Sequence, residues 1–299
     1  MTSSEQKQAE EQTFRNYVPS QAKTYSVNRG SYYENLFKVI LEHHESAGGT
    51  FGTLLDIGCG PGNSNWPLAK HFATAYGIDP SLDMIDAAKG IGAEAGEAET
   101  TTGKPIEFIE GKAENFIDHV WAHWFDMQRC WTSAAQVLHK GETIALWGSA
   151  SQFCHPSIPN AACVQEALFK LMREDLAPYE LPGSRLARGG YDNLPLPWSF
   201  DPPIEGFSRD GFTRHDWDRN EVLSDGEHFF LGDHHVTLAR YQEAVNMGNT
   251  VTKWREAHPQ LVGADEDVVV EGFRRIGEAL GGDELVVGAS YSLLLLKRD

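Results

Sequence analysis

The sequence of 299 residues has no long apolar run and few cysteines. No stretch approaches the roughly 20 apolar residues of a membrane-spanning helix, so no membrane partner is expected. The four cysteines form no CxxC pair, which argues against a zinc knuckle or a disulfide framework. Residues 1–12 are polar and acidic, unlike a targeting signal, and are predicted to be a disordered tail. These absences predict a cytoplasmic protein.

Positive charge is also scarce, because 25 Lys and Arg stand against 43 Asp and Glu, giving a formal net charge of −18. Such a surface repels a phosphate backbone, so nucleic acid is not an expected substrate. A hydrophobic fraction of 41% is ordinary for a soluble globular chain, and the length allows one elaborated α/β domain over residues 13–299. Nothing in the sequence indicates the oligomeric state.

Strands and helices alternate through the first half of the chain, which predicts a parallel sheet with helices on both faces. The expected strands are residues 53–57, 75–78, 106–109 and 143–147. The expected helices are residues 32–44, residues 65–72, a helix beginning at Ser81, and residues 126–138 with Asp126 as N-cap. Residues 90–103, rich in Gly, Glu and Thr, are predicted to be a solvated connection.

The second half of the chain does not continue this alternation of strands and helices. Residues 156–203 are rich in Pro, Gly and aromatics around one helix at 161–176, a composition that suits a substrate-facing insertion. A strand at 212–217, helices at 238–254 and 266–280, and a final strand at 284–296 are expected to follow. We divide the domain into an N-terminal arm (13–50), a core (51–150), the insertion (about 151–205) and C-terminal helices and strands (206–299).

The most informative segment is LLDIGCGPG at residues 54–62, a buried strand followed by glycine at every second position. Glycine permits backbone angles closed to other residues and lets a ligand approach the main chain. A dinucleotide-binding turn more often reads GxGxxG, so this GxGxG spacing disfavours a nucleotide-dependent oxidoreductase. Asp56 precedes the first glycine, where a carboxylate could hold the cationic amine of a methionyl group.

A second acid follows about twenty residues later, since Asp79 ends the next expected strand. An acid at that place can accept hydrogen bonds from both hydroxyls of a ribose. Its alternative role is a helix cap before Pro80 and Ser81. The glycine turn and this acid together indicate a cofactor site more strongly than either does alone.

These segments resemble motif I and the following strand of class I S-adenosylmethionine-dependent methyltransferases. More narrowly, the chain resembles a fungal branch related to trans-aconitate methyltransferase. The matching segments are YSVNRGSYY (25–33), LLDIGCGPG (54–62), GIDPSLDMIDAAK (77–89), AHWFDM (122–127), TIALWG (143–148), GSRL (183–186) and LPLPW (194–198). The resemblance implies S-adenosylmethionine as cofactor and a Rossmann-like α/β fold. It also implies a seven-stranded, mostly parallel sheet with helices on both faces, whose last strand, 284–296, is antiparallel.

The resemblance further implies which residues contact the cofactor: Asp56, Gly58, Gly60, Asp79, Ala113 and Glu114. Ala113 and Glu114 follow the third strand and would lie near the adenine. The alternative for Glu114 is a solvated surface acid.

The chain departs from the family at the expected fourth strand, for which residues 116–125 are the only candidate. A central parallel strand needs a nearly continuous apolar run. Asp118, His119 and His123 interrupt this one, so residues typical of that strand are missing. This departure calls activity into question more than the fold.

Several residues are candidates for the acceptor side of the reaction. A carboxylate acceptor needs no general base, whereas a hydroxyl acceptor would benefit from one, and His123 is the candidate. Tyr25, Trp124 and Trp147 could attract the sulfonium of the cofactor, with packing in the core as their alternative role.

The same resemblance places Arg29 and Arg185 near the active site, where a guanidinium fork suits a carboxylate. Their alternative role is a surface ion pair. The pairs His43–His44 and His234–His235 lack further ligands at useful spacing, so they are predicted to be solvated, and no metal is expected.

The sequence therefore predicts a methyltransferase acting on a small molecule, with O-methylation of a carboxylic acid or secondary metabolite as the leading reaction. The alternative is a protein of this fold that binds a small molecule, or catalyses a rearrangement, without methyl transfer. The interrupted fourth strand motivates that alternative. Specificity would lie in the insertion, where no motif identifies the acceptor.

Overall fold

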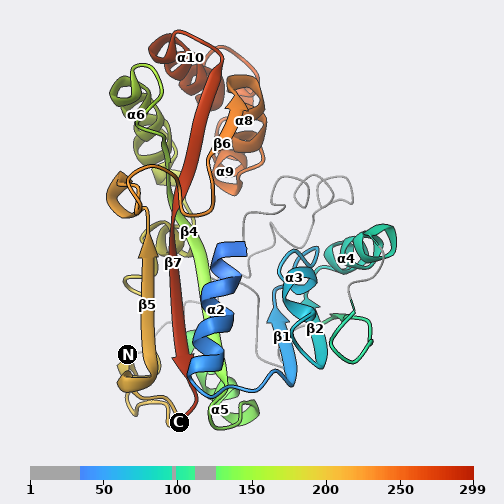
Figure 1. The fold of residues 1–299 in the computed structure, drawn as a ribbon. Coiled ribbons are helices and arrows are strands. Elements are labelled where there is room, and N and C mark those ends of the chain that lie inside the picture. The colour runs from blue at the N-terminus through green and yellow to red at the C-terminus, as the bar shows by residue number, and fades with distance from the viewer. Residues whose placement is uncertain (1–33, 96–98, 112–125) are drawn as a thin grey trace, which may run out of the picture. The chain divides into compact units, whose positions relative to one another are not determined.

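A computed structural model describes residues 34–95, 99–111 and 126–299 of the chain. These residues form two compact units (Figure 1). The described part of the first unit is residues 51–95 and 99–111, and that of the second is residues 34–50 and 126–299. Each unit has its own sheet and its own buried apolar core.

The first unit is a three-stranded parallel sheet in the order β1-β2-β3, formed by β1 (Thr53–Ile57), β2 (Thr74–Asp79) and β3 (Glu107–Glu110). Parallel neighbours need crossover connections, and α3 (Asn65–Ala69) and α4 (Leu82–Ala95) lie in these connections. Ile85 and Ala88 of α4 are fully buried and pack in one cluster with Ala75 and Phe108 of the strands. This packing fixes the carboxyl ends of β1 and β2 next to each other.

The sheet of the second unit is organised by its last strand, β7 (Glu284–Lys297), which pairs antiparallel with each of the other three strands. These are β4 (Thr143–Cys154), β5 (Phe212–Trp217) and β6 (His234–Thr237). The order is β4-β7-β5, with β6 beside the first residues of β7. The expected antiparallel last strand is confirmed, and β4 and β5 run parallel to each other.

Helix α2 (Glu34–Ser46) belongs to the second unit and packs on its sheet. Leu36 is fully buried in one cluster with Leu293 and Leu295 of β7. Phe37 meets Trp147 of β4 edge to face, with ring centroids 6.3 Å apart. The helix is therefore held by the middle of the sheet.

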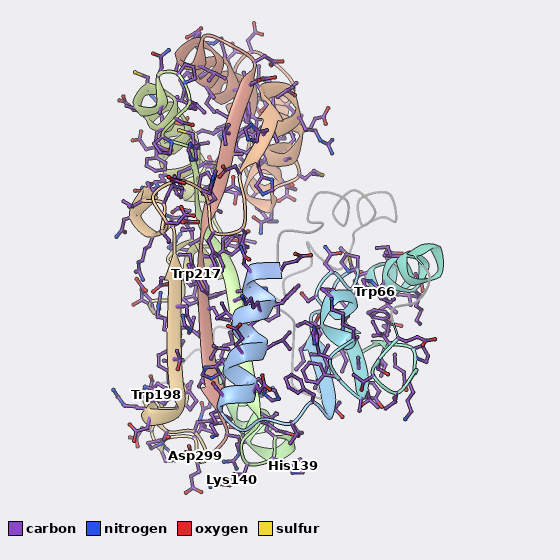
Figure 2. The ribbon with its side chains drawn as sticks, viewed as in Figure 1. Trp66, His139, Lys140, Trp198, Trp217 and Asp299 are labelled. Carbon is purple, nitrogen blue, oxygen red and sulfur yellow. The ribbon has the colours of Figure 1, made fainter. Side chains whose placement is uncertain are left out.

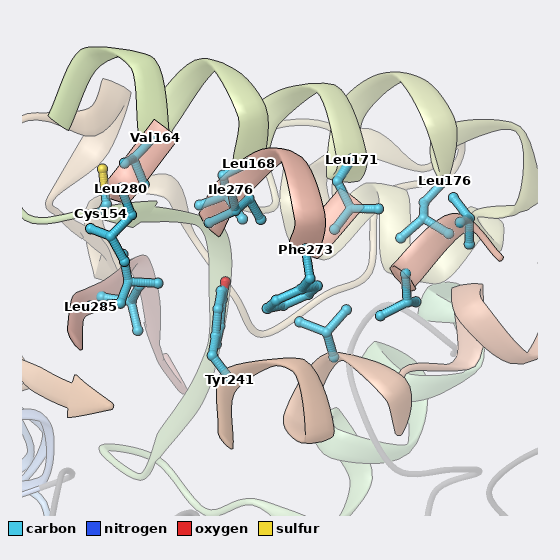
Figure 3. Close-up of a cluster of buried hydrophobic side chains, with 14 of the residues drawn as sticks. Cys154, Val164, Leu168, Leu171, Leu176, Tyr241, Phe273, Ile276, Leu280 and Leu285 are labelled. Atoms are coloured by element: carbon cyan, nitrogen blue, oxygen red, sulfur yellow. The ribbon is translucent and has the colours of Figure 1, made fainter. Parts of the chain in front are cut away.

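Helical segments within residues 161–176 and 238–280 of the second unit build a further core (Figure 3). Leu168 and Leu171 there face Phe273 and Ile276. The α-helices are α5 (Met127–Val137), α6 (Ala161–Phe169), α7 (Pro182–Arg188), α8 (Leu238–Asn246), α9 (Asn249–Ala257) and α10 (Val268–Leu280). A π-helix, η4 (Lys170–Asp175), continues α6, and 3₁₀ turns are η5 (Ala177–Tyr179), η6 (Pro197–Ser199), η7 (Arg209–Gly211), η8 (Arg219–Glu221) and η9 (Pro259–Leu261).

The fully buried side chain of Asp267 begins α10. Its carboxylate accepts hydrogen bonds from the backbone N–H groups of Val269 (2.9 Å) and Gly263 (3.1 Å). Arg255 of α9 donates to both of its oxygens, from Nε at 2.9 Å and from Nη2 at 3.2 Å. One buried acid thus joins two helices and caps the second of them.

The expectation of one seven-stranded sheet is not met by the described residues, whose strands form two separate sheets. Residues 116–125 were expected to supply the fourth strand of that sheet. That segment lies outside the described residues. The α/β, Rossmann-like character of the chain holds without it.

Several element boundaries differ from the sequence-based predictions. The helix expected at 238–254 is two helices, because Gly248 has extended backbone angles (φ −69°, ψ 138°) and serves as the N-cap of α9. Helix α4 continues through Gly90 to Ala95, where a solvated connection was expected. Strand β4 continues past Trp147 to Cys154, and the short strand β6 was not predicted.

The prediction that both histidine pairs are solvated is wrong for His44, which is 8% exposed. Its Nδ1 lies 3.0 Å from the hydroxyl of Thr143, and its Nε2 lies 3.0 Å from the carbonyl oxygen of Thr50. His44 is therefore a structural contact between α2 and β4. None of the helices in the described parts is long and apolar enough to cross a membrane.

Candidate functional site

The glycine turn after β1 is the first part of the candidate site. Gly58, Gly60 and Gly62 have φ angles of +77°, +52° and +82°, in the left-handed region that favours glycine. The backbone N–H groups of Gly58 and Cys59 donate to the carbonyl oxygen of Ile78, at 2.7 and 3.1 Å. These bonds hold the turn against the end of β2.

Asp79, the last residue of β2, is 5% exposed. Its Oδ2 accepts a hydrogen bond from the backbone N–H of Gly60, and its Oδ1 accepts one from the backbone N–H of Ser81, both at 2.9 Å. The carboxylate thus holds the backbone just before α4, as in the cap role considered for it, and it also contacts the glycine turn. Each oxygen retains a second lone pair for a further donor.

Asp56, next to the last residue of β1, carries an unpaired buried oxygen. Its Oδ2 is shielded from solvent and accepts no hydrogen bond from any described residue. Buried polar atoms in proteins are nearly always paired, so an unpaired carboxylate oxygen marks a place where a donor is missing. A cationic amine is the donor that such an oxygen would gain most from.

The two acids make this part of the first unit electrostatically favourable for a cation. Burial and, to a smaller extent, the charge of Asp79 together raise the pKa of Asp56 to about 7. Burial also raises the pKa of Asp79 to about 6, against the effect of its two backbone hydrogen bonds. A positive ligand would restore both groups to their charged form, whereas a pyrophosphate would be repelled.

Space for a ligand lies at the turn itself. A Cβ built on Gly60 would meet no atom of the described residues within 4 Å, whereas a Cβ built on Gly62 would lie 2.9 Å from both Phe108 and Trp66. Trp66 is labelled in Figure 2. The turn thus has a packed inner side and an open outer side. This open side, the unpaired Asp56 oxygen and the acid at the end of β2 fit the methionyl and ribose parts of S-adenosylmethionine.

The remaining predicted site residues lie partly inside and partly outside the described residues. Six of them, Tyr25, Arg29, Ala113, Glu114, His123 and Trp124, lie outside the described residues. Trp147 is half-buried between β4 and α2, in edge contact with Phe37, so packing accounts for this face of its ring. Arg185 lies on α7 with 63% of its side chain exposed, and its Nε is 3.9 Å from Oε2 of Glu180.

Glu180 is held mainly by another arginine, Arg188, which donates to both of its oxygens at 2.8 and 2.7 Å. The surface ion pair considered for Arg185 is therefore present only as a long contact. In the described parts of the chain, no group of three or more His, Cys, Asp or Glu side chains is arranged to hold a metal ion.

Sequence reasoning missed the buried polar groups below the turn. Asn65 is fully buried and donates to the carbonyl oxygen of Tyr76 at 3.2 Å, while its Oδ1 has no partner among the described residues. Nε1 of Trp66 is likewise buried and unpaired there. The sequence carries a weak signal for them, since a polar Asn at the start of a short apolar helix is unusual unless its amide is satisfied internally.

Comparison with known proteins identifies the same segment. A family model described as a methyltransferase domain matches residues 55–146. A probable S-adenosylmethionine-dependent methyltransferase of Saccharomyces cerevisiae is 30% identical over 134 residues, covering 41% of this chain and 43% of that protein. A methyltransferase of Aspergillus candidus is 32% identical over 108 residues, covering 36% and 31%. The chain thus matches less than half the length of either relative.

A solved structure of a methyltransferase from Anaeromyxobacter dehalogenans superposes with a TM-score of 0.56 and 17% identity, covering 87% of this chain and 95% of that one. At that identity the likeness shows the fold alone, an α/β Rossmann-like methyltransferase fold. The family match, by contrast, covers β1, the glycine turn and Asp79. Residues 55–146 therefore resemble a methyltransferase domain.

Proposed function

We propose that this chain transfers a methyl group from S-adenosylmethionine to a small molecule, and that the acceptor group is a carboxylate. The observation that carries the cofactor part is the solvent-shielded Oδ2 of Asp56, which has no hydrogen-bond partner among the described residues, beside a glycine turn that those residues leave open. The acceptor part rests on the resemblance to the fungal branch related to trans-aconitate methyltransferase and on the arginines near the expected site.

In this proposal the turn and the two acids hold the cofactor. Asp56 accepts from the methionyl amine, and Asp79 accepts from the ribose hydroxyls with the lone pairs that Gly60 and Ser81 leave unused. The absence of a side chain at Gly58 and Gly60 lets the ligand lie against the backbone. Ala113 and Glu114 would contact the adenine.

The acceptor side involves both arginines named from the sequence. Arg29 and Arg185 would hold acceptor carboxylates, and the long contact of Arg185 with Glu180 leaves its guanidinium fork open to solvent. Aromatic side chains of Tyr25, Trp124 and Trp147 would line the site around the sulfonium.

The chemistry asks little of the protein beyond positioning. When bound, S-adenosylmethionine would supply a methyl group on a positively charged sulfur: the acceptor oxygen bonds to the methyl carbon as the carbon–sulfur bond breaks and the neutral thioether leaves. A carboxylate oxygen carries no proton, so this step needs no general base. The residues of this chain would orient the two reactants and exclude water. His123 would matter as a base only for a hydroxyl acceptor.

The test is transfer of radioactive methyl from S-adenosylmethionine to a panel of mono-, di- and tricarboxylic acids, each paired with its neutral amide. We expect label in the acids and not in the amides, and none with Asp56→Asn. Label transferred equally to the amides would contradict a carboxylate acceptor. Binding of the cofactor with no transfer to any small molecule would instead favour the alternative of a binding protein with this fold.

A further inference from the structure

Two buried oxygen atoms near the glycine turn have no hydrogen-bond donor among the described residues. They are Oδ2 of Asp56, on β1, and Oδ1 of Asn65, the first residue of α3. Both residues belong to the first unit. A buried acceptor without a donor is costly and rare in folded proteins, so a hydrogen is expected at both atoms.

The register of the sheet brings these two side chains to the same face. Asp56 of β1 pairs with Gly77 of β2, and paired residues of neighbouring strands point to the same side of a sheet. A Cβ built on Gly77 would lie 3.0 Å from Oδ1 of Asn65. Because neighbouring strands are only about 4.8 Å apart, the Asn65 amide lies over the position next to Asp56. Gly77 places no side chain between them.

The surroundings of the two oxygens are closed and apolar. Asn65 is fully buried. Cε1 of Phe108 would lie 2.8 Å from the same Cβ on Gly77, and the Phe108 ring packs against Trp66 with ring centroids 5.3 Å apart. A carboxylate is poorly solvated in such a place, which favours the protonated form of Asp56.

Asn65 has one structural contact, and it uses the other end of the amide. Its Nδ2 donates to the carbonyl oxygen of Tyr76 at 3.2 Å, which ties the start of α3 to β2. This bond also fixes the orientation of the amide, because a carbonyl oxygen can face only the NH₂ end. Oδ1 is therefore the end that lies over Gly77, and the contact with Tyr76 does not account for it.

Asp56 can supply the hydrogen that both oxygens lack. Burial and, to a smaller extent, the charge of Asp79 raise its pKa to about 7, so the acid keeps its proton below neutral pH. Among the described residues, no charge of α3 or α4 acts on this carboxyl. Cys59 in the turn stays a neutral thiol, because burial raises its pKa.

We propose that Asp56 and Asn65 share one hydrogen in the free protein, with Oδ2 of the protonated acid donating to Oδ1 of the amide, and that the cationic amine of the cofactor replaces this hydrogen. Asn65 is then a positioning residue that acts through Asp56. On binding, the proton leaves Asp56 for solvent, and the carboxylate accepts a hydrogen from the ammonium. This inference rests on the proposed function, because the amine belongs to that cofactor.

The pH dependence of binding isolates this role of Asn65. The affinity for S-adenosylhomocysteine should rise with pH until Asp56 is deprotonated in the free protein, and then stay constant. The pH of this bend equals the pKa of Asp56 in the free protein. A purely structural defect would lower the affinity at every pH and leave the bend in place. A change in the hydrogen-bond partner of the acid moves the bend.

The experiment is calorimetric titration of the full chain with S-adenosylhomocysteine between pH 5 and 8. We expect the wild-type bend near pH 7. Asn65→Leu keeps the volume but removes the acceptor that favours the protonated acid, so the bend should fall by about one pH unit, the size of one net hydrogen bond. Asn65→Asp places a second acid beside Asp56, so the bend should move to higher pH.

Trp66→Phe is the matched control. It removes another buried polar atom that is unpaired among the described residues, but this atom is a donor and lies where a Cβ on Gly62 would be, 2.9 Å away. The ring contact with Phe108 is kept. The bend of this variant should therefore equal that of wild type.

The same pKa can be measured without a ligand, from urea unfolding. Because the pKa of Asp56 is raised above 3.8, the fold loses stability as pH rises from about 4 to the folded pKa. This loss should be complete near pH 7 in wild type and about one pH unit lower in Asn65→Leu. It should be absent from Asp56→Asn.

Opposite shifts in the two Asn65 variants support the shared hydrogen. An unchanged bend in both, or shifts in the same direction, would overturn it. If Asn65→Leu is too unstable to titrate, the direction of the shift in Asn65→Asp decides. A wild-type chain that binds no S-adenosylhomocysteine at any pH would defeat the proposed function, and the unfolding curves would still test the hydrogen shared by Asp56 and Asn65.

Discussion

The backbone N–H of Gly60 donates to Oδ2 of Asp79 at 2.9 Å, across 19 positions of sequence. The bond joins the glycine turn after β1 to the acid that ends β2. The two motifs that indicate the cofactor are therefore one structural unit. Replacing an acid or a glycine of this unit should therefore change both the shape of the turn and the binding of the ligand.

Replacing Asp79 by Ala should weaken the affinity for S-adenosylhomocysteine by about 2 to 3 kcal/mol, because a charge-assisted pair of hydrogen bonds is lost. The free energy of unfolding at pH 8 should change by less than the free energy of ligand binding. The N–H groups of Gly60 and Ser81 lose their acceptor, while the cost of a buried charge is removed. Calorimetry and urea unfolding measure the two effects. Asp86→Ala, an exposed acid on α4, is the control, and an unchanged affinity in folded Asp79→Ala would refute the ribose role.

Replacing Gly60 by Val should abolish cofactor binding. A branched side chain at φ +52° is strained, and it would fill the open side of the turn. Gly103→Val is a matched control in the same unit, since Gly103 has φ +72° and its Cβ would have only Glu99 near it, at 3.7 Å. Both variants should lose similar stability, but Gly103→Val should still bind. Full binding by Gly60→Val would mean that the turn serves the fold alone.

The affinity for S-adenosylhomocysteine should depend on pH through Asp56. Its pKa is about 7 in the free protein, and a cationic amine favours the charged form. Below pH 7 the acid must lose a proton on binding, so affinity should fall as pH drops from 7 to 5. Above pH 7 the affinity should no longer depend on pH. Calorimetry in two buffers of different ionisation enthalpy should detect proton release near pH 6.

Asp56→Asn is the control for that pH dependence. The variant should bind weakly at every pH and release no proton through this position. The sign for stability is the reverse of binding: burial raises the pKa of Asp56 above its usual 3.8, so the free wild-type fold loses stability as pH rises from about 4 to 7. Wild-type binding that is flat between pH 5 and 8 would count against an amine held by Asp56.

Replacing Asp267 by Ala should destabilise the second unit by about 3 to 5 kcal/mol, because the Arg255 guanidinium and two backbone donors lose their buried partner. Urea unfolding followed by tryptophan fluorescence reports this unit through Trp254 of α9. Asp265→Ala, an exposed acid two positions earlier, should cost little. A loss of less than about 1 kcal/mol in the free energy of unfolding of Asp267→Ala would show that the ion pair between Asp267 and Arg255 does not hold α9 to α10.

Much of the local structure followed from the sequence because local signals were strong. Asp126 caps α5 as expected, with Oδ1 accepting from the N–H of Arg129 at 3.2 Å. The helix expected to begin at Ser81 is α4, and its residues Met84, Ile85 and Ala88 are all buried. The break at Gly248 was missed because both sides of it carry helical patterns, and only the backbone angles of one residue divide them.

The candidate site was predictable only where chemistry is concentrated in a short segment. The sequence predicted a cofactor site from the spacing of Asp56, the glycines of the turn and Asp79. All of them lie at or just after the ends of β1 and β2. Oδ1 of Asn65 and Nε1 of Trp66 have no partner among the described residues, and that depends on the packing around them, which no sequence pattern marks. These two buried polar groups could therefore be found only in the folded chain.

The central claim is that the turn and its two acids bind a cationic methionyl nucleoside. The most direct measurement is calorimetric titration of the wild-type chain and Asp56→Asn at pH 7.5 with S-adenosylmethionine, S-adenosylhomocysteine and NAD. The account predicts that wild type binds both methionyl nucleosides and not NAD, and that Asp56→Asn loses most of that affinity. Binding of NAD by wild type, or undiminished binding of S-adenosylmethionine by Asp56→Asn, would contradict it.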